Sequence, residues 1–270
     1  MPRMRWNPTR KWYLWNMASK QQYRFGNTVL GVLSPEPLTV NDQITHFEVP
    51  AETIPDYTFY LRVGETVPPA ARDVGYFHLE RTGNDVHVYL GEGYRPGSMS
   101  MAHFLGQAQA YGLLLEKGAF VLHASYVLVN GRALLFSAPS GTGKSTQAHF
   151  WRDERGARIV NEDRVVIFPK DGIYYATGCW AMGSAKVTDS VEAPIEALIL
   201  LSQGSENSVR PIRPLQAIQW VVEQCSYDPK DPVQKCHVLE TVCNALSSLR
   251  ILSYECINHP SSVDELEKYL

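Results

Sequence analysis

The sequence has no long hydrophobic run, no CxxC pair and no excess of basic residues, and each absence excludes a class of protein. A membrane-spanning helix needs about 20 apolar residues in a row, and no stretch approaches that length. The five cysteines form an odd set without the close spacing of zinc or redox motifs, so we expect reduced, mostly buried thiols. The formal net charge of −3 gives no electrostatic reason to expect nucleic acid as a partner.

The composition of the 270-residue chain is that of a folded globular protein. Hydrophobic residues make up 44% and aromatic residues 11%, which argues against a disordered chain. No internal repeat is visible, which argues against a solenoid. The basic, tryptophan-rich start of the chain has no apolar stretch of signal-peptide type behind it, so we expect a cytoplasmic protein with no membrane partner.

The first part of the chain is predicted to be rich in β-strands. Short apolar stretches alternate with turn signals at a spacing typical of antiparallel strands. These stretches are residues 28–33, 46–49, 57–63, 74–79 and 86–90. Residues 82–85 lie between two of them and predict a hairpin turn. We therefore expect a β-rich N-terminal domain over residues 1–97.

The rest of the chain alternates helical and strand-like patterns. A helix is predicted from Ser98 or Ser100 to Gly118, and Asn130-Gly131 between two apolar stretches is a strong hairpin signal. The later pattern predicts helices over 146–155, 215–224, 233–246 and 261–269, and strands over 158–168, 195–201 and 250–256. This alternation indicates an α/β nucleotide-binding domain over residues 98–270, in a chain that is α+β overall.

The sequence that begins at Ala138 matches the phosphate-binding loop pattern GxxxxGK[ST], with alanine in place of the first glycine. Gly141 and Gly143 let the backbone turn its N–H groups toward phosphates, and Lys144 supplies a cation for the β and γ oxygens. The Ser145 hydroxyl is the expected Mg²⁺ ligand. We therefore predict a nucleotide site formed by Ala138, Pro139, Ser140, Gly141, Thr142, Gly143, Lys144, Ser145 and Thr146.

Glu162 and Asp163 are the predicted acids of this site. Phosphoryl transfer needs a group that positions the nucleophile or accepts its proton, and a carboxylate that holds the metal. The pair lies inside a stretch that we predict to be an apolar strand, where charged side chains require partners. We predict both as catalytic residues and Asp163, with Ser145, as a metal ligand. The alternative is a solvated pair of acids in a turn.

Two weaker features are also candidates for substrate binding. The loop over residues 177–186 can close over a substrate, with Gly178 and Gly183 as hinges and Lys186 near the transferred phosphate, or it can be a surface connection. The N-terminal arm can bind an acidic or extended peptide, or pack on its own domain or another subunit. Its basic and aromatic residues are Arg3, Arg5, Trp6, Arg10, Lys11, Trp12, Tyr13 and Trp15.

These motifs resemble the catalytic domain of the HPr kinase/phosphorylase family. The matching segments are residues 122–125, 128–131, 137–146 and 156–165. They are still more similar to the HPr-kinase-related proteins found beside peptide-modifying gene sets, in a family whose core resembles ATP-dependent phosphoenolpyruvate carboxykinases. The likeness extends from about Met101 to the C-terminus. The first hundred residues do not resemble the N-terminal domain of the bifunctional enzyme.

The resemblance implies roles for individual residues. His123 matches the family's active-site histidine, although a histidine in an apolar strand is by itself more often a core residue. Lys144 and Ser145 match the loop lysine and the metal-binding hydroxyl. Glu162 stands where the family usually carries the first of two aspartates, the proposed base, and Asp163 matches the second. The extra methylene of Glu162 moves its carboxylate by about 1 Å, so the backbone compensates, Asp163 takes the main role, or activity is reduced.

The leading hypothesis is a kinase that uses ATP and Mg²⁺ to phosphorylate a Ser or Thr hydroxyl of a peptide or small protein. A small-molecule kinase built on the same nucleotide site is one alternative. A non-catalytic nucleotide-binding module is another, and the replacement at Glu162 is its best support. The sequence leaves open the acceptor, the reverse phosphorolysis, the choice of ATP over GTP and whether the chain forms a homo-oligomer.

Overall fold

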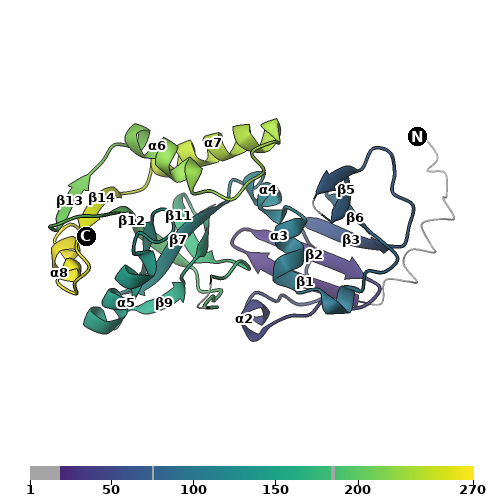
Figure 1. The fold of residues 1–270 in the computed structure, drawn as a ribbon, viewed down its shortest axis with the longest axis horizontal. Helices are drawn as coiled ribbons and strands as arrows, with labels where there is room; N and C mark the ends of the chain where they lie inside the picture. The colour runs from purple at the N-terminus through teal and green to yellow at the C-terminus, as the bar shows by residue number, and fades with distance from the viewer. Residues whose placement is uncertain (1–18, 75, 184–185) are drawn as a thin grey trace. The chain divides into compact units, whose positions relative to one another are not determined.

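The computed structural model describes residues 19–74, 76–183 and 186–270, which form two compact units (Figure 1). The first unit contains residues 19–24, Val29–Asn41 and Glu48–Ala108. The second contains Phe25–Thr28, Asp42–Phe47 and Gln109–Leu270. The division into domains 1–97 and 98–270 stays a prediction, and the basic N-terminal arm lies outside the described residues.

The first unit is built on a six-stranded sheet in the order β1-β2-β3-β6-β5-β4. β3 pairs in parallel with β2 and with β6, whereas β5 pairs antiparallel with β6 and β4. The prediction of antiparallel strands is therefore wrong at the centre of this sheet, because a long connection separates β3 from β2 and another separates β3 from β6. The strands are β1 Ser19–Phe25, β2 Thr28–Ser34, β3 Tyr57–Val63, β4 Arg72–Val74, β5 Phe77–Thr82 and β6 Asp85–Leu90.

In the predicted β-rich part, the structure differs from the prediction at two stretches and confirms a third. The stretch 46–49 is not a strand, since the short helix α2, Asp42–Thr45, precedes it and only Glu48 makes an isolated bridge. The stretch 74–79 is divided between β4 and β5. The hairpin predicted at 82–85 joins β5 to β6, with Thr82 opposite Asp85.

The single helix predicted up to Gly118 is two helices, α3 Met101–Gln107 and α4 Ala110–Leu115. Ser100 caps α3, since its side chain accepts a hydrogen bond from the backbone N–H of His103. The break falls at Gln109, whose φ of 56° is left-handed. Its amide donates to Asp228 at 3.1 Å. A contact between residues so far apart in the sequence leaves no trace in local periodicity.

The second unit is built on an eight-stranded sheet with the main order β11-β10-β7-β8-β12-β14-β13, and β9 pairs with β7. β8, β12 and β14 are parallel neighbours, while β7 is antiparallel to β8 through the predicted Asn130-Gly131 hairpin. The strands are β7 Phe120–Val129, β8 Arg132–Ser137, β9 Arg158–Asn161, β10 Arg164–Lys170, β11 Ile173–Gly178, β12 Ala193–Gln203, β13 Ser208–Pro211 and β14 Ile251–Cys256.

Helices cover both faces of this sheet (Figure 1). Leu135 packs in one apolar cluster with Val221 of α6 and Val238 of α7. Leu134, the preceding residue, points to the other face and packs with Trp151 of α5 and residues of α8. The helices are α5 Lys144–Arg155, α6 Pro214–Glu223, α7 Pro232–Leu246 and α8 Ser262–Glu267. The chain is thus a mixed α/β protein with two sheets.

No helix within the described ranges has the length and apolar character needed to cross a membrane.

Gly178, the last residue of β11, contacts Thr188 and Asp189, which follow the loop over residues 177–186. Its N–H donates to the carbonyl of Asp189 at 3.1 Å. A Cβ at this position would lie 2.3 Å from that carbonyl oxygen and 2.5 Å from the hydroxyl of Thr188. The residue is therefore a point of close approach between the two ends of the loop, and its role as a hinge stays a prediction.

We expect Gly178→Ala to lower the free energy of unfolding by roughly 1–3 kcal/mol, because the added methyl group forces two backbone segments apart. Urea denaturation measures the loss. Gly91→Ala is the matched control, since a Cβ there meets no atom within 4 Å. Equal stabilities of the two variants would show that the segments near Thr188 separate at no cost.

Candidate functional site

The structure places the phosphate-loop motif between the end of β8 and the start of α5. Gly141 and Gly143 have φ values of 78° and 112°, a region that glycine adopts without strain. The helix begins at Lys144, two residues before the predicted start. A helix N-terminus presents unpaired N–H groups and partial positive charge, both of which suit a phosphate group.

The Lys144 side chain is folded back along the loop. It is 6% exposed, and its Nζ donates to the carbonyls of Ala138 at 2.9 Å and Pro139 at 3.2 Å. Burial lowers the pKa of Lys144, and the negative charge of Asp163 opposes this shift. A desolvated ammonium group that donates to two backbone carbonyl oxygens favours the approach of an anion.

Glu162 and Asp163 lie in a tight turn between β9 and β10, so the prediction that they sit inside one continuous strand is wrong. The break is made by Asn161, which is fully buried. Its Oδ1 accepts hydrogen bonds from the backbone N–H of Asp163 at 2.7 Å and of Arg164 at 2.9 Å. Its Nδ2 donates to Thr188 at 2.9 Å, which anchors the turn to the chain just before β12.

Asp163 contacts two nitrogen-bearing side chains. Its Oδ1 lies 3.4 Å from Nε2 of His123 and 3.4 Å from Nη1 of Arg164. The hydrogen bond with His123 and the nearby charge of Arg164 hold the pKa of Asp163 below its usual value, although burial opposes them. The other ring nitrogen of His123 lies 3.2 Å from Oε1 of Gln224. This carboxylate therefore stays ionised at neutral pH.

Glu162 has a different partner, His149 of α5. The Nε2 atom of His149 lies 3.0 Å from Oε1 of Glu162, and the two side chains are 44% and 10% exposed. His149 was not predicted from the sequence as a residue of the site. His149 and Glu162 are thirteen positions apart in the sequence, and they meet because α5 passes beside the turn. No local sequence pattern predicts such a contact.

The predicted residues come together around one cavity of about 310 Å³. It is lined by His123, Ser140, Gly141, Gly143, Lys144, Ser145, Thr146, Glu162, Asp163 and Gly183. We call it the acidic-pair cavity. Three residues of the predicted nucleotide site do not line it: Ala138 and Pro139 bond to Lys144 instead, and Thr142 faces a neighbouring cavity.

Gly183 brings the loop after β11 next to the acids. A Cβ at this position would lie 3.1 Å from the Cβ of Asp163, so the loop backbone covers that side chain. Lys186 turns back to bond the Gly183 carbonyl through its backbone N–H, and it does not line the acidic-pair cavity. The predicted contact of Lys186 with a transferred phosphate stays a prediction.

The residues present suit Mg²⁺ held together with phosphates. The Ser145 hydroxyl and the Asp163 carboxylate, both hard oxygen donors, line the same cavity. Mg²⁺ keeps several waters and commonly takes one or two carboxylates plus phosphate oxygens. A protein cage of three or more His, Cys, Asp or Glu side chains is absent from the described residues. Ser145 and Asp163 are therefore suitable ligands for Mg²⁺ that binds together with a phosphate-containing substrate.

No family model and no curated protein matches the chain. Among solved structures, it is similar to the Hpr(Ser) kinase/phosphatase from Coxiella burnetii, with 13% sequence identity and a TM-score of 0.29. The match covers 55% of this chain and 88% of that one. At this level of likeness, only the residues of the site bear on function.

The lowered pKa of Asp163 predicts how its contribution to stability changes with pH. In the unfolded chain an aspartate takes up a proton near pH 4, about where its ordinary pKa lies, while the folded form stays ionised to lower pH. The stabilisation is therefore complete above the unfolded pKa and is lost as the pH falls through the folded one.

We expect the difference in unfolding free energy between wild type and Asp163→Asn to shrink as the pH falls below about 4. Urea denaturation at a series of pH values, with a chelator present, measures it. Asp85→Asn, in the first unit, is the control. A difference that stays constant down to pH 3 would mean that His123 and Arg164 do not favour the ionised form.

Proposed function

We propose that the protein is an ATP- and Mg²⁺-dependent kinase that transfers the γ-phosphate to a Ser or Thr hydroxyl of a peptide or small protein. One observation carries this proposal: Lys144 and Ser145 of the loop line the same cavity as Glu162 and Asp163. Catalysis of phosphoryl transfer rests mainly on positioning and electrostatics, and this set offers a cation, a hydroxyl and two carboxylates.

In the proposed transfer of the γ-phosphate, each residue of the acidic-pair cavity has its own role. The acceptor oxygen forms a bond to the γ-phosphorus, the bond from that phosphorus to the bridging oxygen of ADP breaks, and the hydroxyl proton passes to a carboxylate. Glu162 is assigned as this proton acceptor, because the lowered pKa of Asp163 makes it a weaker base and a better metal ligand. Lys144 and His123 stabilise charge on the transferring group.

Mg²⁺, when bound, neutralises charge on the phosphate oxygens, and Ser145 and Asp163 would hold it.

A non-catalytic nucleotide-binding module is the second candidate. The observation that favours it is the contact of His149 with Oε1 of Glu162, which occupies one oxygen of the assigned proton acceptor. The same contact also serves a kinase if it fixes the longer side chain of Glu162 in place. Activity with and without an acceptor separates these two functions.

The first test is ATP consumption with Mg²⁺ and candidate acceptor peptides, followed by mass spectrometry for an added phosphate. We expect the wild type to modify a Ser or Thr and Lys144→Ala to lose at least about 100-fold in rate, because the cation that stabilises the transferring group is gone. Lys170→Ala, a change on the surface of the same unit, is the control and keeps full activity.

Phosphate found on a small hydroxyl compound and on no peptide would replace the proposal by a small-molecule kinase. Binding of ATP without transfer to any acceptor would leave the non-catalytic module.

The second test asks whether His149 holds Glu162 in position. Glu162→Asp shortens the side chain by one methylene, which ends the 3.0 Å contact, and we expect a roughly 100-fold slower transfer. His149→Leu lowers the rate in the same direction, and the double variant is no slower than Glu162→Asp alone, because both changes remove one interaction. Nucleotide affinity stays unchanged in all three.

Additive losses in the double variant would contradict a shared role for the pair. His103→Leu, an exposed histidine of the first unit, is the control for loss of an imidazole.

A further inference from the structure

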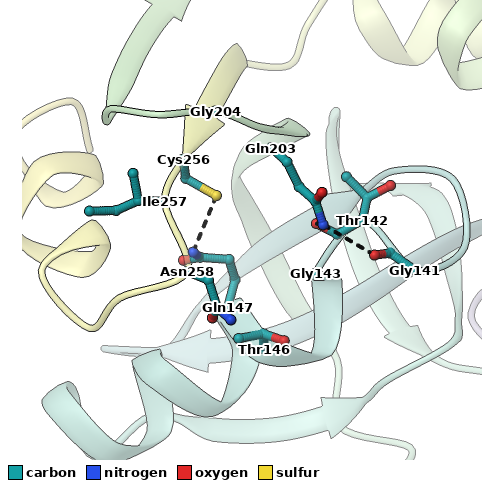
Figure 2. A pocket seen from close by; sticks show the side chains of 10 residues that line it. All are labelled: Gly141, Thr142, Gly143, Thr146, Gln147, Gln203, Gly204, Cys256, Ile257 and Asn258. Atoms are coloured by element: carbon teal, nitrogen blue, oxygen red, sulfur yellow. Dashed lines mark hydrogen bonds between the residues drawn. The ribbon is translucent and has the colours of Figure 1, made fainter.

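A second cavity, of about 380 Å³, adjoins the phosphate-loop motif (Figure 2). Its lining residues come from the loop, from the start of α5, from the last residues of β12 and β14 and from the chain just after these strands. They are Gly141, Thr142, Gly143, Thr146, Gln147, Gln203, Gly204, Cys256, Ile257 and Asn258. Gly141, Gly143 and Thr146 also line the acidic-pair cavity, so the two spaces meet at the loop. We call this one the strand-end cavity.

The position of the strand-end cavity follows from the sheet. β8, β12 and β14 are adjacent parallel strands, and Gln203 pairs with Cys256 at their last register position. Their carboxyl ends therefore lie at one edge. In open α/β sheets, ligands bind in the crevice outside the carboxyl ends of the strands. A volume of about 380 Å³ is within the range of small-molecule sites.

The end of β12 is bonded to the phosphate-loop motif. The Nε2 atom of Gln203 donates to the carbonyl of Gly141 at 3.3 Å (Figure 2) and to the carbonyl of Thr142 at 3.4 Å. On the opposite wall, Gln147 donates to the sulfur of Cys256 at 3.4 Å. The first two contacts hold the end of β12 to the loop, and the third holds the end of β14 to α5.

The chemistry of the two cavities differs. The acidic-pair cavity contains Lys144, His123 and both carboxylates, whereas none of the ten residues that line the strand-end cavity carries a charge or an aromatic ring. A phosphate chain and an acceptor hydroxyl belong with the charged groups. The amides of Gln203 and Asn258 and the hydroxyls of the two threonines suit a neutral, polar group with several donors and acceptors.

We propose that the strand-end cavity binds the nucleoside part of the nucleotide, so that a nucleoside polyphosphate lies across the loop with its terminal phosphate at Asp163. This inference rests on the proposed nucleotide-dependent function. It also identifies the residues that would contact the ribose and the base. Because base contacts come from amides, hydroxyls and backbone groups, recognition here uses hydrogen bonds and not aromatic stacking.

The test compares ADP with inorganic pyrophosphate, which shares the phosphates and lacks the nucleoside. Asn258 is exposed and lines the cavity, so Asn258→Trp fills the space without entering the core. We expect calorimetry with Mg²⁺ to show ADP binding weakened at least about tenfold and pyrophosphate binding changed by less than about twofold. Ser248→Trp, an exposed site away from this cavity, is the control and changes neither.

The possible results separate this inference from the kinase proposal. A selective change in ADP affinity supports the nucleoside site even if no acceptor is ever phosphorylated. Unchanged ADP affinity in Asn258→Trp overturns the nucleoside site, whether or not phosphate transfer is found. Parallel losses for ADP and pyrophosphate overturn it as well, because they would place phosphates in the strand-end cavity. Absence of binding by both ligands in the wild type overturns both proposals.

Discussion

The side chain of Asn161 fixes the geometry on which the site depends. It is buried, it accepts hydrogen bonds from the N–H groups of Asp163 and Arg164, and it donates to Thr188. These three bonds end one strand and start the next, so both acids face the loop from a turn. Thr188 in turn bonds the backbone of Cys179, which ties the chain after β11 to the same point. A buried polar network of this kind is rigid only while every member has its partner.

This constraint gives the two neighbouring carboxylates different surroundings. Asp163 faces His123 and Arg164, which favour its ionised form, while Glu162 reaches across to His149 on the loop helix. Glu162 carries one methylene more than an aspartate, and its Oε1 lies 3.0 Å from Nε2 of His149. The two cavities also differ in chemistry: charged groups line the acidic-pair cavity, and neutral polar groups line the strand-end cavity.

Local sequence was a good guide wherever local forces decide the structure. The phosphate-loop motif with its two glycines, the Asn130-Gly131 hairpin and the Ser100 cap depend on residues a few positions apart, and each lies where it was predicted. It was a poor guide at Gln109 and at Asn161. In both places a polar side chain bonds a distant residue, Asp228 or Thr188, and the backbone breaks there although the apolar pattern continues.

The mixed α/β class and the identities of Lys144, Ser145 and the two acids follow from the order of residues alone, because periodicity and motif spacing are local properties. The partners of those acids do not. Asp163 meets His123 and Glu162 meets His149, and the ends of β12 and β14 form a cavity beside the loop. These contacts depend on how strands far apart in the chain are ordered in the sheet. Packing sets that order, since it decides which faces of the strands and helices can be buried together.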